Sequence, residues 1–207
     1  GRGELLRVQR HHRLVGEGLL DLAADLLLEV GRPLEVRARV RLHPGLSYWD
    51  GGAVLGRFAT MLATVTDATG RAVSMHRTYL QGARKAPVPE PKKLMEGLAL
   101  AGAAIRLTPV SRTLGIAEGI ETALAAAELF EVPTWSCIST AGIESFEPPE
   151  GVEHVIIFAD HDGNFAGQAA AYRAAHRLAL RGYEVEVVIP PTAGDWLDEL
   201  NRRNHTN

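Results

Sequence analysis

The sequence predicts an α/β protein in which a parallel sheet with flanking helices is preceded by a smaller α+β lobe with an antiparallel hairpin. Two observations support this class. From about residue 113 onward, short apolar runs alternate with helical patterns, which is typical of a parallel sheet with covering helices. Upstream of that point, the strand-like runs 58–66 and 72–80 flank a turn at Asp67–Gly70, which favours a hairpin.

Charge divides the chain at the same place. Residues 1–112 carry 17 Lys and Arg against 10 Asp and Glu, whereas residues 113–207 carry 5 against 15. We therefore expect two domains, 1–112 and 113–207, of which the basic one holds phosphates and the acidic one holds cations. The alternative is an ordinary variation of surface charge along the chain.

The composition is that of a globular protein with a core, because 46% of the residues are hydrophobic. No apolar run approaches the roughly 18 residues of a membrane helix, and the polar, basic start does not resemble a signal peptide. Cys137 is the only cysteine, which excludes an internal disulfide or a cysteine zinc cluster and fits the cytosol. These features predict a cytoplasmic protein without a membrane segment, and the absence of an initial Met suggests a fragment of a longer chain.

The first part is expected to contain one helix and several strands. Apolar residues recur at helical spacing over 19–30, and Gly31 begins the segment that ends this helix. Residues 34–42 alternate apolar side chains with arginines, which predicts a half-buried strand with a basic outer face. An irregular connection is predicted over 83–97 and a further strand over 103–107.

The second part has a regular β/α rhythm. The predicted strands are 114–117, 134–139, 154–159 and 183–189, and the predicted helices begin at Ile120 and span 166–181. Strands in such an arrangement are parallel, so their carboxyl ends lie on one edge of the sheet.

Acidic residues follow three of these strands: Glu118, the pair Asp160 and Asp162, and the pair Asp195 and Asp198. The strand-end rule brings them together on the edge where open α/β sheets bind ligands. Carboxylates that close repel one another unless a cation lies between them, and oxygen-only ligands suit Mg²⁺ or Mn²⁺. The alternative is a set of loop acids exposed to solvent.

The motifs that carry these acids resemble a known family. They are Ala117-Glu118-Gly119-Ile120-Glu121-Thr122-Ala123-Leu124, then Asp160-His161-Asp162 with Gly167, then Gly194-Asp195-Trp196-Leu197-Asp198. In order, spacing and strand context they resemble the Toprim domain, a small Rossmann-like parallel sheet, over residues 113–200. The resemblance is strongest to primases of phages and mobile elements, which are related to bacterial replicative primases. It implies that Glu118 is a ligand or general base, that Asp160 and Asp162 are metal ligands, and that Asp195 or Asp198 is an auxiliary acid.

The first part resembles the amino-terminal lobe of the same primase core. The segments that carry this resemblance are Leu42-His43-Pro44 and Gly70–Leu80, followed by Lys85. In that lobe an Arg and a Lys on or after a hairpin strand face the metal site. The resemblance therefore implies that Arg77 and Lys85 contact template or nucleotide phosphates, with His76 and Tyr79 in the same binding region.

Taken together, the resemblance implies a DNA primase, a nucleotidyltransferase that makes short RNA primers on a single-stranded DNA template. The implied cofactor is Mg²⁺ or Mn²⁺, and the implied partners are single-stranded DNA, ribonucleoside triphosphates and a helicase, fused or separate. The setting would be the replication of a phage, plasmid or mobile element. Known relatives often carry a zinc-binding module upstream and a helicase downstream.

Two other functions remain open at this point. A metal-dependent Toprim nuclease would use the same acids without nucleotides, and a non-catalytic nucleic-acid-binding module would keep only the surface. A topoisomerase is disfavoured because it needs a tyrosine nucleophile on a further domain. Among single residues, His161 is expected to be a spacer. Glu121 could support the metal ligands from behind, but an ordinary acid favoured at a helix start by the macrodipole is the preferred interpretation.

Overall fold

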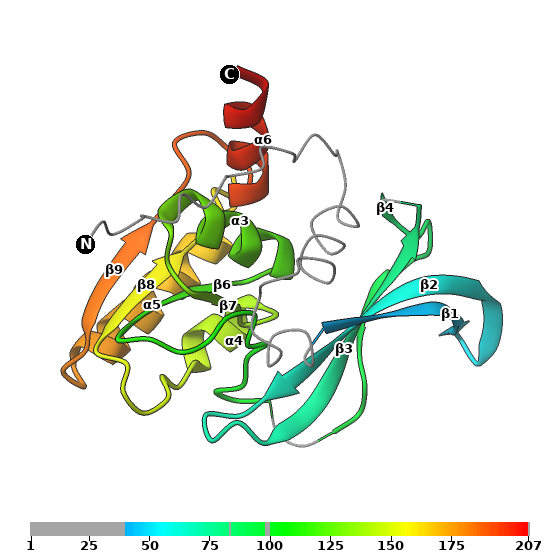
Figure 1. Ribbon diagram of the computed structural model, residues 1–207, viewed down its shortest axis with the longest axis horizontal. Helices are drawn as coiled ribbons and strands as arrows, with labels where there is room; N and C mark the ends of the chain where they lie inside the picture. The colour runs from blue at the N-terminus through cyan, green and yellow to red at the C-terminus, as the bar shows by residue number, and fades with distance from the viewer. Residues whose placement is uncertain (1–39, 83, 98–99, 207) are drawn as a thin grey trace, which may run out of the picture.

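The computed structural model describes residues 40–82, 84–97 and 100–206 (Figure 1). The helix predicted over 19–30 lies outside the described residues, as do Arg37 and Arg39 of the predicted basic strand. Of the helices in the described part of the chain, none is long and apolar enough to span a membrane.

An antiparallel sheet forms the amino-terminal lobe. Its strands are β1 (Val40–Asp50), β2 (Ala53–Thr66), β3 (Ala72–Gln81), β4 (Arg84–Lys85) and β5 (Lys92–Leu94). The order is β1-β2-β3-β4, and β5 pairs with β3 beyond the short β4. The predicted hairpin is confirmed as β2–β3, with Leu62 opposite Arg77.

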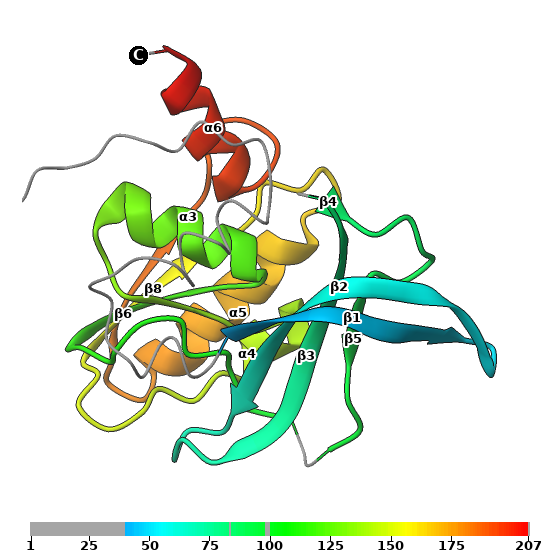
Figure 2. The same cartoon turned by 45° about the vertical axis from the view of Figure 1, so that its right-hand side comes forward.

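The structure corrects the sequence prediction at three places in this lobe. β1 and β2 form a second, longer hairpin that projects away from the rest of the molecule (Figure 2), and its turn at Gly51-Gly52 has φ values of 53° and 83° that favour glycine. The supposed irregular connection contains β4 and β5, because both pair with β3. The strand predicted over 103–107 is reduced to single bridges at Ala104 and Ile105.

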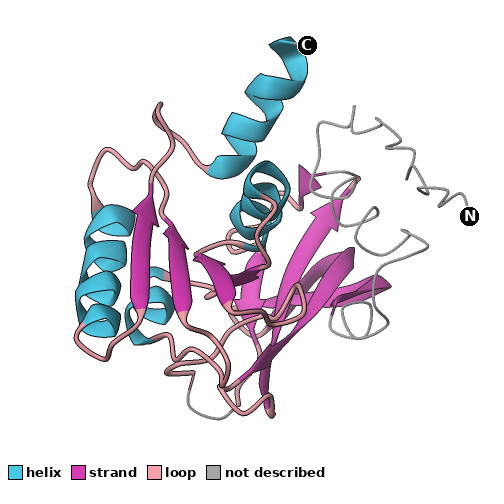
Figure 3. Cartoon of the chain, turned by 60° about the vertical axis from the view of Figure 1, so that its left-hand side comes forward, coloured by secondary structure: helices cyan, strands magenta, loops and turns pink. Residues whose placement is uncertain are grey.

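A parallel sheet of order β7-β6-β8-β9 forms the carboxyl-terminal part, so the predicted α/β class is confirmed. Its strands are β6 (Thr113–Ala117), β7 (Thr134–Ser136), β8 (His154–Phe158) and β9 (Glu184–Val188), and its helices are α3 (Ile120–Phe130), α4 (Thr140–Ser145), α5 (Ala166–Ala179) and α6 (Trp196–Thr206). Helices lie on both sides of this sheet (Figure 3). α4 and α6 were not predicted.

Two hydrophobic clusters fill the two sides of the parallel sheet. One contains Ile116 and Ile157 from the strands together with α4 and α5, through residues such as Leu178. The other joins Ala117 and Phe158 to α3, α6 and the antiparallel sheet. The antiparallel sheet contributes Val40, Met61, Ala63, Val65, Val73 and Leu80 to that second cluster. The two parts of the chain therefore pack on one shared core.

Further contacts tie the two sheets together near β7. Ile105 and Ser136 form a bridge that closes the free edge of β7. Arg106 lies over the Trp135 ring, 4.6 Å from its centroid, and donates to the carbonyls of Asp67 and Ala68 in the β2–β3 turn. At the other end of the sheet, no described strand pairs with the outer edge of β9, where Glu184 is exposed.

Candidate active site

Three acidic residues lie where β6 and β8 end. Ala117 of β6 is paired with Phe158 of β8, so the residues that follow the two strands leave the sheet side by side. Glu118 follows β6 directly, and Asp160 and Asp162 are the second and fourth residues after β8. This arrangement places the three carboxylates on the carboxyl edge of the sheet, the edge at which ligands bind in open α/β folds.

A backbone bridge brings the last acidic loop to the same edge. The His161 amide donates to the Gly194 carbonyl at 2.9 Å, and the Gly194 amide donates back to the His161 carbonyl at 3.3 Å. The His161 ring lies 3.0 Å from the Pro190 carbonyl through Nδ1, so its side chain links the two loops. Asp195 follows Gly194 and completes the set of Glu118, Asp160, Asp162 and Asp195, which we call the acid edge.

The acidic side chains of this edge perturb one another. Burial raises the pKa of Asp160 to about 7, helped by repulsion from Asp195, Glu118 and Asp162 and opposed by the Thr122 hydroxyl 3.5 Å away. Burial also raises the pKa of Glu118, and repulsion from Asp162 adds to it. The pKa of Asp195 is raised, mainly by burial. A nearby cation would favour the ionised form of all three groups.

The donors of the acid edge suit a hard metal ion. They are carboxylate oxygens, which Mg²⁺ and Mn²⁺ prefer. The Gln168 Oε1 atom is buried beside this edge without a hydrogen-bond partner, while its Nε2 donates to the Asp162 carbonyl at 3.2 Å. Within the described ranges, no three His, Cys, Asp or Glu side chains enclose an ion by themselves. Mg²⁺ ordinarily keeps several waters and binds through one or two carboxylates plus substrate phosphate, so a partial protein ligand set fits it.

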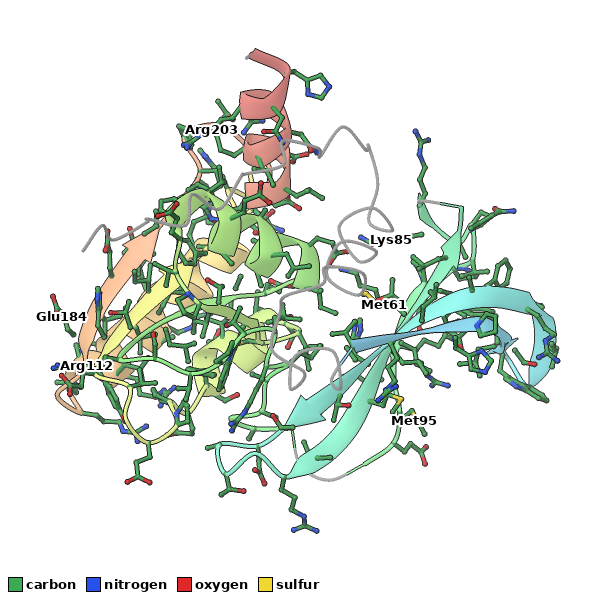
Figure 4. The ribbon with its side chains drawn as sticks, in the orientation of Figure 1. Met61, Lys85, Met95, Arg112, Glu184 and Arg203 are labelled. Atoms are coloured by element: carbon green, nitrogen blue, oxygen red, sulfur yellow. The ribbon has the colours of Figure 1, made fainter. Side chains whose placement is uncertain are left out.

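Two lysines of the antiparallel sheet meet the acidic part at Glu121. Lys85 of β4 and Lys92 of β5 place their Nζ atoms 3.1 and 3.2 Å from Glu121 Oε1, and Figure 4 shows Lys85 directed toward α3. Glu121 is only 7% exposed. Burial alone would raise the pKa of Glu121, but Lys92 and Lys85 outweigh it and lower that pKa. Cationic groups therefore lie close to the acid edge, and the contact of Lys85 with phosphates stays a prediction.

His76 lies on β3, opposite Leu94 of β5 and close to Lys92, and it is buried. Burial and the charge of Lys92 lower the pKa of His76 to about 4, against the opposing effect of Glu121, so the ring is neutral at neutral pH. Its Nδ1 lies 3.5 Å from the Thr78 hydroxyl. The structure therefore places His76 near the predicted site but beneath its surface.

Arg77 and Tyr79 lie on the other face of β3, because side chains alternate along a strand. Arg77 is paired with Lys93, whose Nζ lies 4.2 Å from the centroid of the Tyr48 ring. Tyr79 is buried and packs edge-on against Tyr48, with a centroid separation of 5.0 Å. The pairing register places Arg77 on the face of β3 opposite His76 and Lys92, and its contact with template or nucleotide phosphates stays a prediction.

Asp195 and Asp198 have different surroundings. Asp195 Oδ1 accepts from the Asp198 amide at 2.9 Å, and Asp198 Oδ2 accepts from the Asp195 amide at 3.2 Å. This reciprocal pair is a capping box at the start of α6. Gly194 supports it, since a Cβ there would lie 2.4 Å from Asp198 Oδ2. Asp198 is exposed, whereas Asp195 is partly buried and contributes to the pKa of Asp160. The geometry therefore favours Asp195 as the auxiliary acid.

Comparison with known protein families agrees with the geometry of the acid edge. Residues 113–205 match the family model described as Toprim domain. Residues 113–205 thus have the fold of a Toprim domain. Residues 21–107 match a second model, described as domain of unknown function (DUF7146). Among curated proteins, no sequence matches the chain.

Solved primase structures share the fold of the whole core, with the Toprim domain and the antiparallel lobe together. The DnaG catalytic core is 18% identical, with a TM-score of 0.57 over 88% of this chain and 68% of that chain. The E. coli primase catalytic core is 16% identical, with a TM-score of 0.55 over 88% and 69%. The primase fragment of the bacteriophage T7 primase-helicase is 20% identical, with a TM-score of 0.51 over 72% and 61%. The resemblance to a Toprim primase core is therefore confirmed at the level of the fold.

This chain is shorter than several of those structures. It spans 61% of the phage T7 fragment and 59% of a DNA primase domain from Pseudomonas aeruginosa.

Several residues at the Toprim site were not predicted from the sequence. They are Lys92, Thr122 and Gln168. Lys92 falls in a stretch that reads as irregular, and Glu121 resembles an ordinary helix-start acid. One sequence feature did indicate Glu121 and Thr122: they directly follow Glu118-Gly119, so the first turn of α3 begins at the acid edge.

Strained backbone occurs near the acid edge of the Toprim domain. Three described residues other than glycine have a positive φ: Glu131 at 55°, Ile138 at 75° and Phe165 at 60°. Glu131 is the C-cap of α3, a common place for this conformation. The Ile138 amide donates to the Glu118 carbonyl at 2.8 Å, so its conformation helps to position Glu118. Phe165 follows Asp162 by three residues.

Proposed function

We propose that this chain is the catalytic core of a DNA primase, a nucleotidyltransferase that makes short RNA primers on single-stranded DNA. The observation that carries the proposal is the acid edge itself, a group of carboxylates with raised pKa values beside Lys85 and Lys92. The shared fold supports it, and one structure of that fold is a DnaG primase catalytic domain bound to single-stranded DNA.

The residues of the acid edge would hold Mg²⁺ or Mn²⁺: Glu118, Asp160, Asp162 and Asp195. When bound, such an ion lowers the pKa of an attacking 3′-hydroxyl and neutralises charge that develops on the phosphate. Lys85 and Lys92 now share Glu121, and a phosphate group would compete for their Nζ atoms as a charged acceptor. Gln168 holds the loop of Asp162 through the backbone carbonyl and so keeps the carboxylate in place.

The remaining assignments follow from the same proposal. The basic region 1–112 would carry the template strand, and residues 113–207 would carry the metal and the nucleotide. Arg77, His76 and Tyr79 remain candidates for the nucleic-acid site, Tyr79 and His76 through their influence on neighbouring residues because both are buried. The phage T7 protein in the comparison is a primase-helicase, which supports a helicase partner, fused or separate. Replication of a phage, plasmid or mobile element in the cytoplasm is the proposed setting.

The test is primer synthesis by the purified chain. Single-stranded DNA, ribonucleoside triphosphates and MgCl₂ are expected to give short oligonucleotides, and Asp160→Asn or Glu118→Gln is expected to lower the yield at least about 100-fold. Glu184→Gln, an exposed acid on β9, is the control and is expected to keep full activity. Undiminished synthesis by Asp160→Asn would refute the mechanism. Cleavage of DNA without nucleotides would indicate a nuclease, and DNA binding without any metal binding would indicate a non-catalytic module.

A further inference from the structure

Phe165 combines a strained backbone with an exposed aromatic ring. Its φ of 60° and ψ of 14° lie in the left-handed region, which L residues other than Gly, Asn and Asp seldom adopt. Its side chain is 65% exposed, so burial of the ring in the core does not compensate for the strain. The two preceding residues, Gly163 and Asn164, are types that adopt this conformation at lower cost.

The position of Phe165 relates this strain to the acid edge. The Phe165 amide donates to the Asp162 carbonyl at 3.1 Å, which closes the turn between the acids and α5. The Asn164 side chain accepts from the Ala166 amide at 3.0 Å and fixes the turn from the other side. Glu131 ends a helix, where left-handed backbone is common, and the Ile138 amide donates to the Glu118 carbonyl. Phe165 instead begins α5 as its N-cap, a position where extended backbone is usual. Strain without a packing reason is characteristic of functional positions.

We infer that the Phe165 ring is a stacking platform for a nucleobase whose phosphates are held at the acid edge. This inference rests on the proposed function, since it needs a nucleotide or nucleic-acid phosphate beside Asp160 and Asp162. An aromatic face accepts any base, because every base has a π-face, and exposed aromatic residues beside phosphate-binding groups serve this purpose in nucleic-acid-binding proteins. The base belongs either to a nucleoside triphosphate or to a DNA strand.

Calorimetric titrations of the full chain in MgCl₂ test the inference with three probes: ATP, inorganic tripolyphosphate and a thymidine oligonucleotide. Phe165→Asn removes the ring but suits the left-handed backbone, so its thermal midpoint is expected to equal or exceed that of the wild type. We expect this variant to bind ATP at least about 5-fold more weakly and tripolyphosphate equally well, the factor that stacking of one base typically contributes. Phe165→Trp keeps a ring and is expected to restore ATP binding.

The oligonucleotide distinguishes the source of the base. A loss confined to the oligonucleotide would place a template base on Phe165 and still support the platform. Tyr172→Ala is the matched control, because Tyr172 is 58% exposed on α5 in ordinary helical backbone, and it is expected to change none of the three affinities. Equal affinities of wild type and Phe165→Asn for both ATP and the oligonucleotide would overturn the inference.

Primer synthesis separates this inference from the proposed function. If the protein makes primers but Phe165→Asn changes neither its affinity for ATP nor its affinity for the oligonucleotide, the stacking platform alone is contradicted. A protein that binds ATP through Phe165 yet makes no primer contradicts the primase proposal alone.

Discussion

At the scale of single residues, the acid edge stores electrostatic repulsion in the absence of a metal ion. Asp160 is the clearest case, because its pKa of about 7 exceeds the ordinary value of 3.8. The folded protein therefore binds a proton at Asp160 more tightly than the unfolded chain does. The consequence is a loss of folding stability as the pH rises through the interval between these two values.

We predict that the metal-free protein is less stable at pH 8 than at pH 5. After allowance for solvent screening of a partly exposed group, the contribution of Asp160 to the free energy of unfolding is about 1–2 kcal/mol. Urea unfolding in EDTA at the two pH values measures it. In Asp160→Asn the difference in the free energy of unfolding between the two pH values is expected to be clearly smaller. Some pH dependence is expected to remain, because the pKa values of Glu118 and Asp195 are also raised. The same slope in Asp160→Asn and wild type would contradict the prediction.

Strand-end reasoning predicted the positions of Glu118, Asp160 and Asp162, because parallel strands must deliver their carboxyl ends to one edge. Arg77 could not be placed in the same way. Its face depends on the register of β3 with β2 and β5, and a shift of one residue would have exchanged it with His76. The burial of Glu121 also could not be predicted from the sequence, since it depends on lysines from the distant strands β4 and β5.

At the scale of elements, α6 begins with a pair of acids that has a structural role in addition to its predicted role at the site. Asp195 and Asp198 together read as candidate metal ligands, yet their three-residue spacing is also that of a capping box. The preceding Pro190-Pro191 and Gly194 gave the region the appearance of a loop, so the helix itself was missed. The capping box therefore accounts for Asp198 but only partly for Asp195, because Asp195 also raises the pKa of Asp160.

We predict that two substitutions in this capping box separate its effect on stability from its effect on activity. Asp198→Ala removes the acceptor for the Asp195 amide and is expected to lower the free energy of unfolding by about 1 kcal/mol, with primer synthesis per folded molecule unchanged. Asp195→Asn keeps a good N-cap acceptor and is expected to preserve stability while reducing synthesis at least about 10-fold. Urea unfolding and primer yield on both variants measure the two effects. Retained activity in Asp195→Asn would remove it from the metal-binding set.

At the scale of the whole molecule, the two sheets behave as one packing unit. A domain boundary between residues 112 and 113 stays a prediction, and the shared hydrophobic cluster shows that the parts on either side are packed together. Sequence patterns predicted the two sheets because each has its own periodicity. The contact between them could not be predicted, since it depends on which face of β2 and β3 meets α3.

We predict that Met61 supports both parts of the molecule at once. Met61 is 1% exposed in the shared cluster, and Met61→Ala is expected to lower the free energy of unfolding by about 2–4 kcal/mol. Met95→Ala is the matched control, because Met95 is 46% exposed, and it is expected to cost less than about 1 kcal/mol. Figure 4 labels both residues.

The readout is urea unfolding followed by fluorescence in two single-tryptophan variants, one that keeps Trp49 in the projecting hairpin and one that keeps Trp135 in the parallel sheet. Coincident transitions that both shift in Met61→Ala are expected. Two separate transitions, with only the hairpin signal shifted, would show that the sheets unfold independently.

The unpaired outer edge of β9 bears on how the protein behaves at high concentration. An open strand presents amide and carbonyl groups that can pair with a strand of another copy. Glu184 and Glu186 are both exposed along this short strand, so two copies that approached edge to edge would bring like charges together. The closure of the opposite edge by Ile105 leaves β9 as the open edge within the described part of this sheet. The two glutamates thus oppose self-association at this edge, and salt weakens their effect by screening the charges.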